Sequence, residues 1–383
     1  MTASWLLVAG DVTPLGGMDA ANHALARYLG TRGCDLHLVT HRAWPDVAGL
    51  PGVTLHRVWR PFNRHLLGSP ILSREGRRIW RELGVRSDVA VHAIANGGNC
   101  QLAAANWVHY LHAAFVGQAA GPLAVRARSR LTERRDLGAE RTALGSARVV
   151  ICNSRRTQRD VVERLGIAPE RTRVIYYGSD AARLSYVGEA DRHAAKRALG
   201  RPLDRPLVGF VGALGDRRKA FDTVFAAWKT LSARSDWDAD LVVVGVGREL
   251  PAWRRRVAEA GLGARVVFLG FRPDVPDVLA ALDGLVHPAR YEAYGLSVHE
   301  AICRGVPALV SAAAGVAERY PETLAELLIA NPDDAGELIE RLLGWRRSLE
   351  RFRRLVQPAS DALRGRTWDA MSGEIVACVT RAA

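Results

Sequence analysis

The chain has 383 residues, of which 48% are hydrophobic and 24% charged, and its formal net charge is +13. The length suits two globular domains of ordinary size, and the composition is that of a globular protein and not of a disordered or fibrous one. No apolar run reaches the roughly 18 residues of a membrane-spanning helix, and the five scattered cysteines favour reduced thiols without a structural zinc.

Short apolar runs alternate with amphipathic helical patterns in the first half of the chain. This alternation predicts a parallel sheet in an α/β domain. The first run is short and follows no basic region, so it predicts a buried strand and not a signal peptide. The expected strands lie at 5–9, 36–40, 89–95, 106–109 and 148–152, with a helix over 18–32.

Two features of this half lie where strands end. Gly16 and Gly17 follow the first strand, where they allow a ligand to approach the backbone or simply make a tight turn. His109 and His112 end a later strand. A single histidine is usually structural, but one at the carboxyl end of a parallel strand can face a ligand. We favour His112 over His109 for that role.

The positive charge is carried almost wholly by arginine, because there are only three lysines. Arginine excess reflects coding composition or an anionic partner, such as a nucleotide sugar, a phospholipid surface or nucleic acid. One expected helix is crowded with arginines but has no interleaved aromatic platform, so we expect no nucleic acid and favour a membrane surface. The arginines are Arg126, Arg128, Arg130, Arg134, Arg135 and Arg141.

The strand and helix pattern restarts after a polar stretch at 180–206, which we take as the interdomain region. The second set of strands is expected at 207–212, 241–245, 266–269, 284–287 and 308–311. The fold class is therefore α/β, with two tandem Rossmann-like, doubly wound domains and a ligand at the carboxyl ends of the strands. We expect domains at 1–185 and 186–365, and a last helix within 366–383 that returns to the first domain.

The most informative stretch runs from 287 to 307. A buried strand ends at its start, a loop with Gly295 follows, and a helix opens near Leu296. The free N–H groups of that helix and the positive end of its dipole suit a phosphate.

Two glutamates in this stretch are candidate ligands for hydroxyl groups. Glu292 lies on the loop and Glu300 about one turn inside the helix, with Tyr294 beside them. Each glutamate also has an interpretation without a ligand. Ser297 and Glu300 fit a capping box, and Glu292 fits a solvated loop carboxylate.

Two further stretches follow strands of the second half. After Gly212 a turn carries three consecutive cations, among them Arg218 and Lys219, which indicate either a solvated basic turn or a diphosphate site. A Gly-x-Gly pair begins at Gly245, but it lacks the third glycine of a dinucleotide fingerprint.

The 287–307 stretch resembles the signature of glycosyltransferase family 4, a retaining family with the GT-B fold. The signature is a glutamate, seven residues and a second glutamate, followed by A-x-x-x-G-x-P and later by G-x-x-E. The matching residues are Glu292, Glu300, Ala301, Gly305, Pro307, Gly315 and Glu318.

The resemblance implies a role for each part of this signature, with the donor in an interdomain cleft. Glu292 would contact the transferred sugar and Glu300 the donor ribose. The amides of Tyr294, Gly295 and Leu296 would contact the sugar and diphosphate.

The resemblance also extends to the basic turn and to the first half of the chain. Lys219 matches the family's phosphate-binding lysine. The usual arginine is Ala213 here, with Arg218 as a candidate replacement, and the usual glycine is Ala220. The remaining donor contacts would come from the family's loops at Gly16, Gly17, Gly212 and Gly245, and from Gly270, Phe271 and Val275 around the nucleobase.

The function implied is transfer of a hexose-type sugar from a UDP- or GDP-linked donor to a hydroxyl of a glycolipid, polysaccharide or natural product. The residues assigned to catalysis are Glu292, His112 and Lys219. No Asp-x-Asp follows a strand, so we expect no metal or other cofactor. We expect a cytoplasmic enzyme, with peripheral contact at the inner membrane face left open. The alternatives are a nucleotide-sugar epimerase of the same fold and a non-catalytic nucleotide-sugar binder.

Overall fold

The computed structural model describes residues 3–86, 89–115, 123–215 and 217–382. The side chains of 86 and 123–129 fall outside the described set, so Arg126 and Arg128 of the basic helix are not considered further. The chain divides into two compact units. The first comprises Met1–Gly178 and Thr367–Ala383, and the second Ser179–Arg366.

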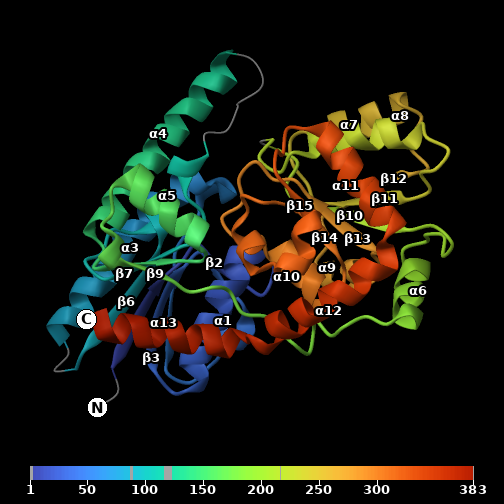
Figure 1. The fold of residues 1–383 in the computed structure, drawn as a ribbon. Helices are drawn as coiled ribbons and strands as arrows, with labels where there is room; N and C mark the ends of the chain where they lie inside the picture. Colours follow the sequence, from blue (N-terminus) through green and yellow to red (C-terminus); the bar gives the residue numbers. More distant parts are fainter. Residues whose placement is uncertain (1–2, 87–88, 116–122, 216, 383) are drawn as a thin grey trace. The chain divides into compact units, whose positions relative to one another are not determined.

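The first unit contains a seven-stranded parallel sheet in the order β5-β3-β1-β6-β7-β8-β9. Figure 1 labels β3, β6, β7 and β9 of this sheet. The order runs outward from β1 in both directions, so the winding reverses at β1. The strands of this sheet are β1 Ser4–Val8, β3 Asp35–Thr40, β5 Val53–Arg57, β6 Val91–Asn96, β7 Ala105–Val108, β8 Val149–Cys152 and β9 Thr172–Val174. Strands β2 Asp11–Val12 and β4 Arg42–Ala43 form a separate two-stranded parallel sheet. The α-helices are α1 Gly17–Thr31, α2 Pro45–Ala48, α3 His65–Arg86, α4 Leu123–Ser146, α5 Arg155–Leu165 and α13 Trp368–Ala382.

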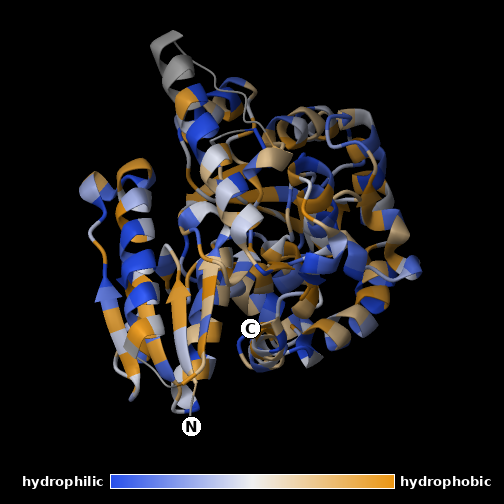
Figure 2. Ribbon diagram, turned by 90° about the vertical axis from the view of Figure 1, so that its left-hand side faces the viewer, coloured by the Kyte–Doolittle hydropathy of each residue, from blue (hydrophilic) through white to orange (hydrophobic). Residues whose placement is uncertain are grey.

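Apolar residues concentrate on the strands, while the helices carry both hydrophilic and hydrophobic stripes (Figure 2). Helix α3 packs on one face of the first sheet, where Leu6 and Val8 lie in a core cluster with Leu72 and Ile79. Burial of these apolar side chains stabilises the packing of α3 on the sheet. No helix in the described ranges is both long enough and apolar enough to cross a bilayer.

Helix α13 joins the first unit from the far end of the chain. It packs along α1 and contacts β6 and β8. Arg32, which caps the carboxyl end of α1, lies 3.5 Å from the Asp369 carboxylate. Where the chain enters this helix, a Cβ on Gly178 would lie 2.3 Å from the carbonyl oxygen of Thr367, so only glycine fits there.

The second unit contains a six-stranded parallel sheet in the order β12-β11-β10-β13-β14-β15. This is the Rossmann strand order, and its winding reverses at β10. The strands are β10 Leu207–Val211, β11 Asp240–Val244, β12 Val266–Gly270, β13 Gly284–His287, β14 Ala308–Ser311 and β15 Leu328–Ile329. The α-helices are α6 Glu189–Ala198, α7 Phe221–Ser232, α8 Leu250–Glu259, α9 Val275–Ala280, α10 Leu296–Cys303, α11 Ala335–Arg347 and α12 Leu349–Gly365.

The expected α/β class with two Rossmann-like sheets is confirmed, and each strand expected from an apolar run is present. The sequence did not indicate the edge strands β5, β9 and β15. Strand β5 lies mostly exposed at the border of its sheet, so it lacks the continuous apolar run of a central strand.

Candidate functional site

Three glycines bring neighbouring strand ends of the second unit into close contact. The Gly212 N–H donates to the Val244 carbonyl over 3.0 Å, and the Gly245 N–H donates to the Gly270 carbonyl over 2.8 Å. Gly245 has φ of +141°, and a Cβ there would lie 1.9 Å from the Gly212 oxygen. The Gly245 position therefore requires glycine for the packing of one loop on another, whether or not a ligand binds.

The basic turn after β10 leads into α7 through a left-handed residue. Ala220, the expected departure from the family glycine, has φ of +53°. This conformation disfavours a side chain by about 1 kcal/mol, which explains why glycine suits the position. The turn places Lys219 beside Gly212, and a Cβ added to Gly212 would lie 3.1 Å from the Lys219 Cγ.

The basic turn is tied to the loop that follows β13. Arg290 donates to both oxygens of Asp222 over 2.8 and 2.9 Å and to Asp333 over 2.6 Å. Its backbone N–H donates to the Arg218 carbonyl over 2.8 Å. Arg217 also pairs with Asp222. The turn is thus not a free solvated loop, because these contacts fix its position against the loop that carries Glu292.

Glu292 lies at the centre of a compact cluster formed by these two loops. Its Oε2 accepts a hydrogen bond from the Lys219 ammonium and another from His287 Nε2 over 2.8 Å. The side chains of Glu292 and Lys219 are only 11% and 13% exposed, and that of His287 is fully buried. The interpretation of Glu292 as a solvated carboxylate is therefore wrong.

The electrostatics of the cluster keep Glu292 ionised. Burial works against its charge, but the charge of Lys219 and the hydrogen bond from His287 outweigh it and hold the pKa of Glu292 well below its ordinary value. Burial, followed by the charge of Lys219, lowers the pKa of His287. His287 is thus a neutral donor beside an anion that is already paired with a cation.

A glycine turn and a helix follow Glu292. Gly295 has φ of +115°, and a Cβ there would lie 2.9 Å from Val316 Cγ1. Helix α10 starts at Leu296, as expected, with Gly295 as its N-cap and no side chain capping it. The capping box of Ser297 and Glu300 is therefore wrong. Tyr294 is buried, and its hydroxyl lies 2.7 Å from His299 Nδ1.

Glu300 is half-buried on α10, and its carboxylate has no hydrogen bond or ion pair with the described residues. Burial raises its pKa to about 7, while the charge of Arg183 works in the opposite direction. A carboxylate in this state gains from a ligand hydroxyl, which can either donate to it or accept from it.

The segment after β12 presents an exposed aromatic ring. Gly270 has φ of +70°, and Phe271 beside it is 65% exposed. Helix α9 then begins at Val275. An exposed ring beside a strand end can cover a planar ligand.

The glycine loop of the first unit lies at the exposed start of α1. Gly16 has φ of +85° and caps the helix, and Gly17 is its first residue. The carboxylate of Asp19, in the first turn, has no hydrogen bond or ion pair with the described residues. Burial and the nearby charge of Asp11 raise the pKa of Asp19 to about 7, against the charges of two arginines.

His112 lies beyond the end of β7 and forms a pair with Glu140 of α4. The Glu140 carboxylate accepts hydrogen bonds from the backbone N–H groups of His112 and Ala113, over 2.8 and 3.0 Å. Its Oε1 also lies 3.2 Å from His112 Nδ1. Glu140 is 1% exposed and His112 is 39% exposed. Burial would lower the pKa of His112, but the hydrogen bond and charge of Glu140 outweigh it and raise that pKa.

His109, the alternative to His112, has a structural environment. It is buried, its Nε2 lies 3.2 Å from Asn96 Nδ2, and its Nδ1 pairs with the Tyr177 hydroxyl. Asn153 donates to its carbonyl over 3.1 Å. Burial lowers the pKa of His109 to about 3.

Sequence reasoning missed two residues of these clusters. His287 ends a buried strand and resembles a core residue, although its place five residues before Glu292 was a usable signal. Glu140 lies in a polar helix 28 residues after His112, and no local pattern marks it. Within the described residues, no three His, Cys, Asp or Glu side chains gather as a metal-ligand set.

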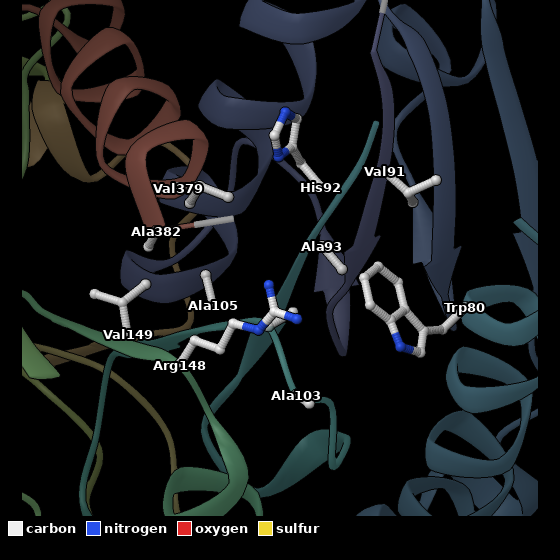
Figure 3. Close-up of a pocket in the computed structure, with 11 residues that line it drawn as sticks. Trp80, Val91, His92, Ala93, Ala103, Ala105, Arg148, Val149, Val379 and Ala382 are labelled. Carbon is white, nitrogen blue, oxygen red and sulfur yellow. The ribbon is translucent and has the colours of Figure 1, made fainter. Parts of the chain in front are cut away.

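Two cavities of the first unit lie at the amino-terminal edge of its sheet. The smaller, of about 20 Å³, lies between the starts of β6, β7 and β8 and the end of α13, and is lined by residues such as Trp80, His92 and Arg148 (Figure 3). The larger, of about 490 Å³, extends from Arg148 toward Arg173 and Arg381. Neither is lined by a candidate site residue, because those follow the carboxyl ends of the strands.

Two protein-family models match the chain. The model described as Glycosyltransferase Family 4 matches residues 15–183, and the model described as Glycosyl transferases group 1 matches residues 205–345. Together they span both units. A relative, the 2-deoxystreptamine N-acetyl-D-glucosaminyltransferase of Streptomyces fradiae, is 30% identical over 382 residues, which cover 92% of this chain and 87% of the relative.

Solved structures show the same fold along the whole chain. WaaG, a glycosyltransferase involved in lipopolysaccharide biosynthesis, has a TM-score of 0.74 at 20% identity, with 98% of this chain and 99% of WaaG covered. Anabaena HepE, solved with UDP and glucose, has a TM-score of 0.74 at 19% identity, with 99% and 100% covered. At such identities the likeness establishes the fold.

Proposed function

Because the chain belongs to glycosyltransferase family 4 and is an enzyme that transfers sugars, we propose that it moves a hexose-type sugar from a UDP- or GDP-linked donor to a hydroxyl acceptor. One observation carries this proposal. The cation Lys219 and the carboxylate Glu292 meet beyond the ends of β10 and β13, beside the point where strand order reverses. Open α/β sheets bind nucleotide ligands at such points.

The proposed roles follow from the chemistry of these side chains. Lys219 and the amides from Tyr294 to Leu296 stabilise the departing diphosphate, with Arg218 as a further cation. Glu292 accepts a hydrogen bond from a hydroxyl of the transferred sugar, and Glu300 accepts a hydrogen bond from a ribose hydroxyl. Fixed cations and helix-end amides stabilise a leaving diphosphate electrostatically, so the reaction proposed needs no metal.

We assign the reaction a retaining course, in which the acceptor attacks the face from which the diphosphate departs. Family membership supports this assignment. His112 and the loop of Gly16 and Gly17 are the proposed first-unit contacts to the donor. The anomeric proton coupling of the product, measured by NMR, distinguishes retention from inversion.

The first donor to test is a UDP-linked hexose. HepE has the same fold and was solved with UDP and glucose. Backbone groups around Gly270 and the exposed Phe271 are the proposed nucleobase contacts, and backbone contacts alone do not discriminate strongly between bases. GDP-mannose therefore belongs in the same panel.

The first acceptor to test is 2-deoxystreptamine, because the Streptomyces fradiae relative is named as a transferase for that compound. The carboxylate of Asp19, two residues after Gly17, would suit a hydroxyl or ammonium group of such an acceptor. A polysaccharide or glycolipid acceptor is tested beside it, with the products identified by mass spectrometry.

Peripheral membrane contact is proposed for one surface of the first unit. Trp59 and Phe62 are 71% and 85% exposed, and the exposed Arg64 follows them. Aromatic side chains next to cations favour an anionic lipid interface. Flotation with phosphatidylglycerol vesicles is expected and flotation with phosphatidylcholine vesicles is not. The loss of flotation in W59S/F62S localises the contact.

The decisive experiment for the enzyme combines binding and turnover. Calorimetry with UDP and GDP, followed by turnover of UDP-glucose, UDP-N-acetylglucosamine and GDP-mannose, is expected to show nucleotide binding and release of nucleoside diphosphate. E292Q is expected to lower turnover strongly to a residual, measurable rate, whereas E322Q, at an exposed glutamate, retains full turnover. A protein that binds no nucleoside diphosphate overturns the proposal, binding without turnover identifies a non-catalytic binder, and an epimerised donor identifies an epimerase.

A further inference from the structure

The Glu292 carboxylate is contacted unequally at its two oxygens. Oε2 accepts a hydrogen bond from the Lys219 ammonium and another from His287 Nε2, the second over 2.8 Å. Oε1 accepts no hydrogen bond from the described residues. One oxygen is thus occupied by the protein, while the other is left to accept a hydrogen bond from elsewhere.

The hydrogen bond to Glu292 defines the tautomer of His287. A carboxylate only accepts, so His287 Nε2 carries the proton. His287 Nδ1 is buried without a partner among the described residues. A proton on Nδ1 would place an unpaired cationic N–H in the interior, so the ring stays neutral with its single proton on Nε2.

The position of His287 makes it a rigid donor. Its side chain is fully buried at the end of β13, and strand residues hold their side chains in fewer orientations than loop residues do. Lys219 reaches Glu292 from the other loop on a flexible side chain. Lys219 therefore neutralises the charge of the Glu292 carboxylate, and His287 fixes the orientation of that carboxylate.

From this geometry we propose that His287 is a positioning residue of the transfer reaction. It holds Oε2 of Glu292, so that Oε1 points at a hydroxyl of the transferred sugar. This inference rests on the proposed function. Its consequence is that His287 contributes to recognition of the sugar and not of the nucleoside diphosphate, because it acts through Glu292 alone.

A double-mutant cycle tests the proposal. The variants are H287L, E292Q and the double variant, with H287Q as the conservative replacement because its amide nitrogen can reach the same place as Nε2. H287M provides a second apolar side chain if H287L does not fold. The measurements are kcat and KM for turnover of UDP-glucose or GDP-mannose, calorimetric affinity for UDP or GDP, and melting temperature.

H287L is expected to lower kcat/KM for the sugar nucleotide by about tenfold, as is typical when the partner that orients a functional group is removed. Its affinity for the nucleoside diphosphate is expected to stay within about twofold of the wild type, since no contact to that ligand is proposed for His287. H287Q is expected to recover most of the loss. In the E292Q background, H287L is expected to change kcat/KM less than twofold.

Three results overturn the positioning role. They are unchanged kcat/KM in H287L, an equal loss with and without Glu292, and a parallel loss of nucleoside diphosphate affinity. A wild-type protein that binds neither UDP nor GDP and turns over no donor overturns the proposed function instead, so the two failures are distinguishable.

Discussion

Each unit pairs a histidine at or beyond the carboxyl end of a parallel strand with a glutamate, and the two pairs differ in exposure and in charged partners. In the second unit, His287 is fully buried and donates to a carboxylate that also pairs with Lys219. In the first unit, His112 is 39% exposed and lies beside Glu140, which contacts no lysine or arginine in the described ranges.

The difference determines which pair can titrate near neutral pH. Burial and Lys219 lower the pKa of His287, whereas Glu140 raises the pKa of His112. The second-unit cluster therefore keeps one charge pattern across neutral pH, as suits the binding of an anionic donor. The first-unit pair can gain or lose a proton there, as suits a group that contacts a reacting hydroxyl.

The largest expected effect comes from removing the cation of the second-unit cluster. Among the described residues, K219M leaves the Glu292 carboxylate with His287 as its only hydrogen-bond partner, and it removes a proposed diphosphate contact. Turnover is expected to fall about 100-fold, and nucleoside diphosphate affinity about tenfold. Lys229, an exposed lysine on α7, provides the matched control. If K229M and K219M lose activity equally, Lys219 has no special role.

The next effect comes from the glycine turn at Gly295, which follows Glu292 and precedes α10. G295A forces a side chain into φ of +115° and against Val316 Cγ1 at 2.9 Å. The expected loss in the free energy of unfolding is about 3 kcal/mol. G261A is the control, because its φ is +69° and a Cβ there meets nothing within 4 Å. It is expected to cost about 1 kcal/mol, and equal losses in chemical denaturation would show that the contact with Val316 is unimportant.

A smaller effect is expected from the carboxylate of the first-unit pair. E140Q presents an amide N–H group where two backbone N–H groups now donate. The free energy of unfolding is expected to fall by about 2 kcal/mol. E163Q, at an exposed glutamate of α5, is expected to change it by less than about 0.5 kcal/mol. Similar losses in the free energy of unfolding for both variants would show that the Glu140 carboxylate does not stabilise the fold.

The smallest effect is the titration that separates the two histidines. By NMR, His112 is expected to titrate above the ordinary value of 6.5, and His287 below it. E140Q should shift the His112 titration downward. Because the folded-state pKa is raised, the stability contributed by the pair is complete below about pH 6.5 and is lost as pH rises through the folded-state value. The stability difference between wild type and H112Q is therefore expected to shrink from pH 6 to pH 9.

The sequence predicted the central strands and the identity of the main site residues for clear reasons. Apolar runs such as 284–287 are buried on both faces, and a glycine turn before a helix marks the place of Glu292. It did not predict that Lys219 and Glu292 pair directly, because they lie 73 residues apart. The partner of each histidine was also hidden, since no short-range pattern connects His112 with a helix 28 residues later.

Helix α13 has a consequence for the order in which the protein folds. A polypeptide leaves the ribosome from its amino terminus, and domains generally fold as units in that order. Here the first unit includes Thr367–Ala383, so it stays without one of its covering helices until that segment is made, after the whole of the second unit. The second unit lies wholly within Ser179–Arg366, so all of its elements are present before α13 is made. The half of the enzyme that is synthesised first is thus the half that is completed last.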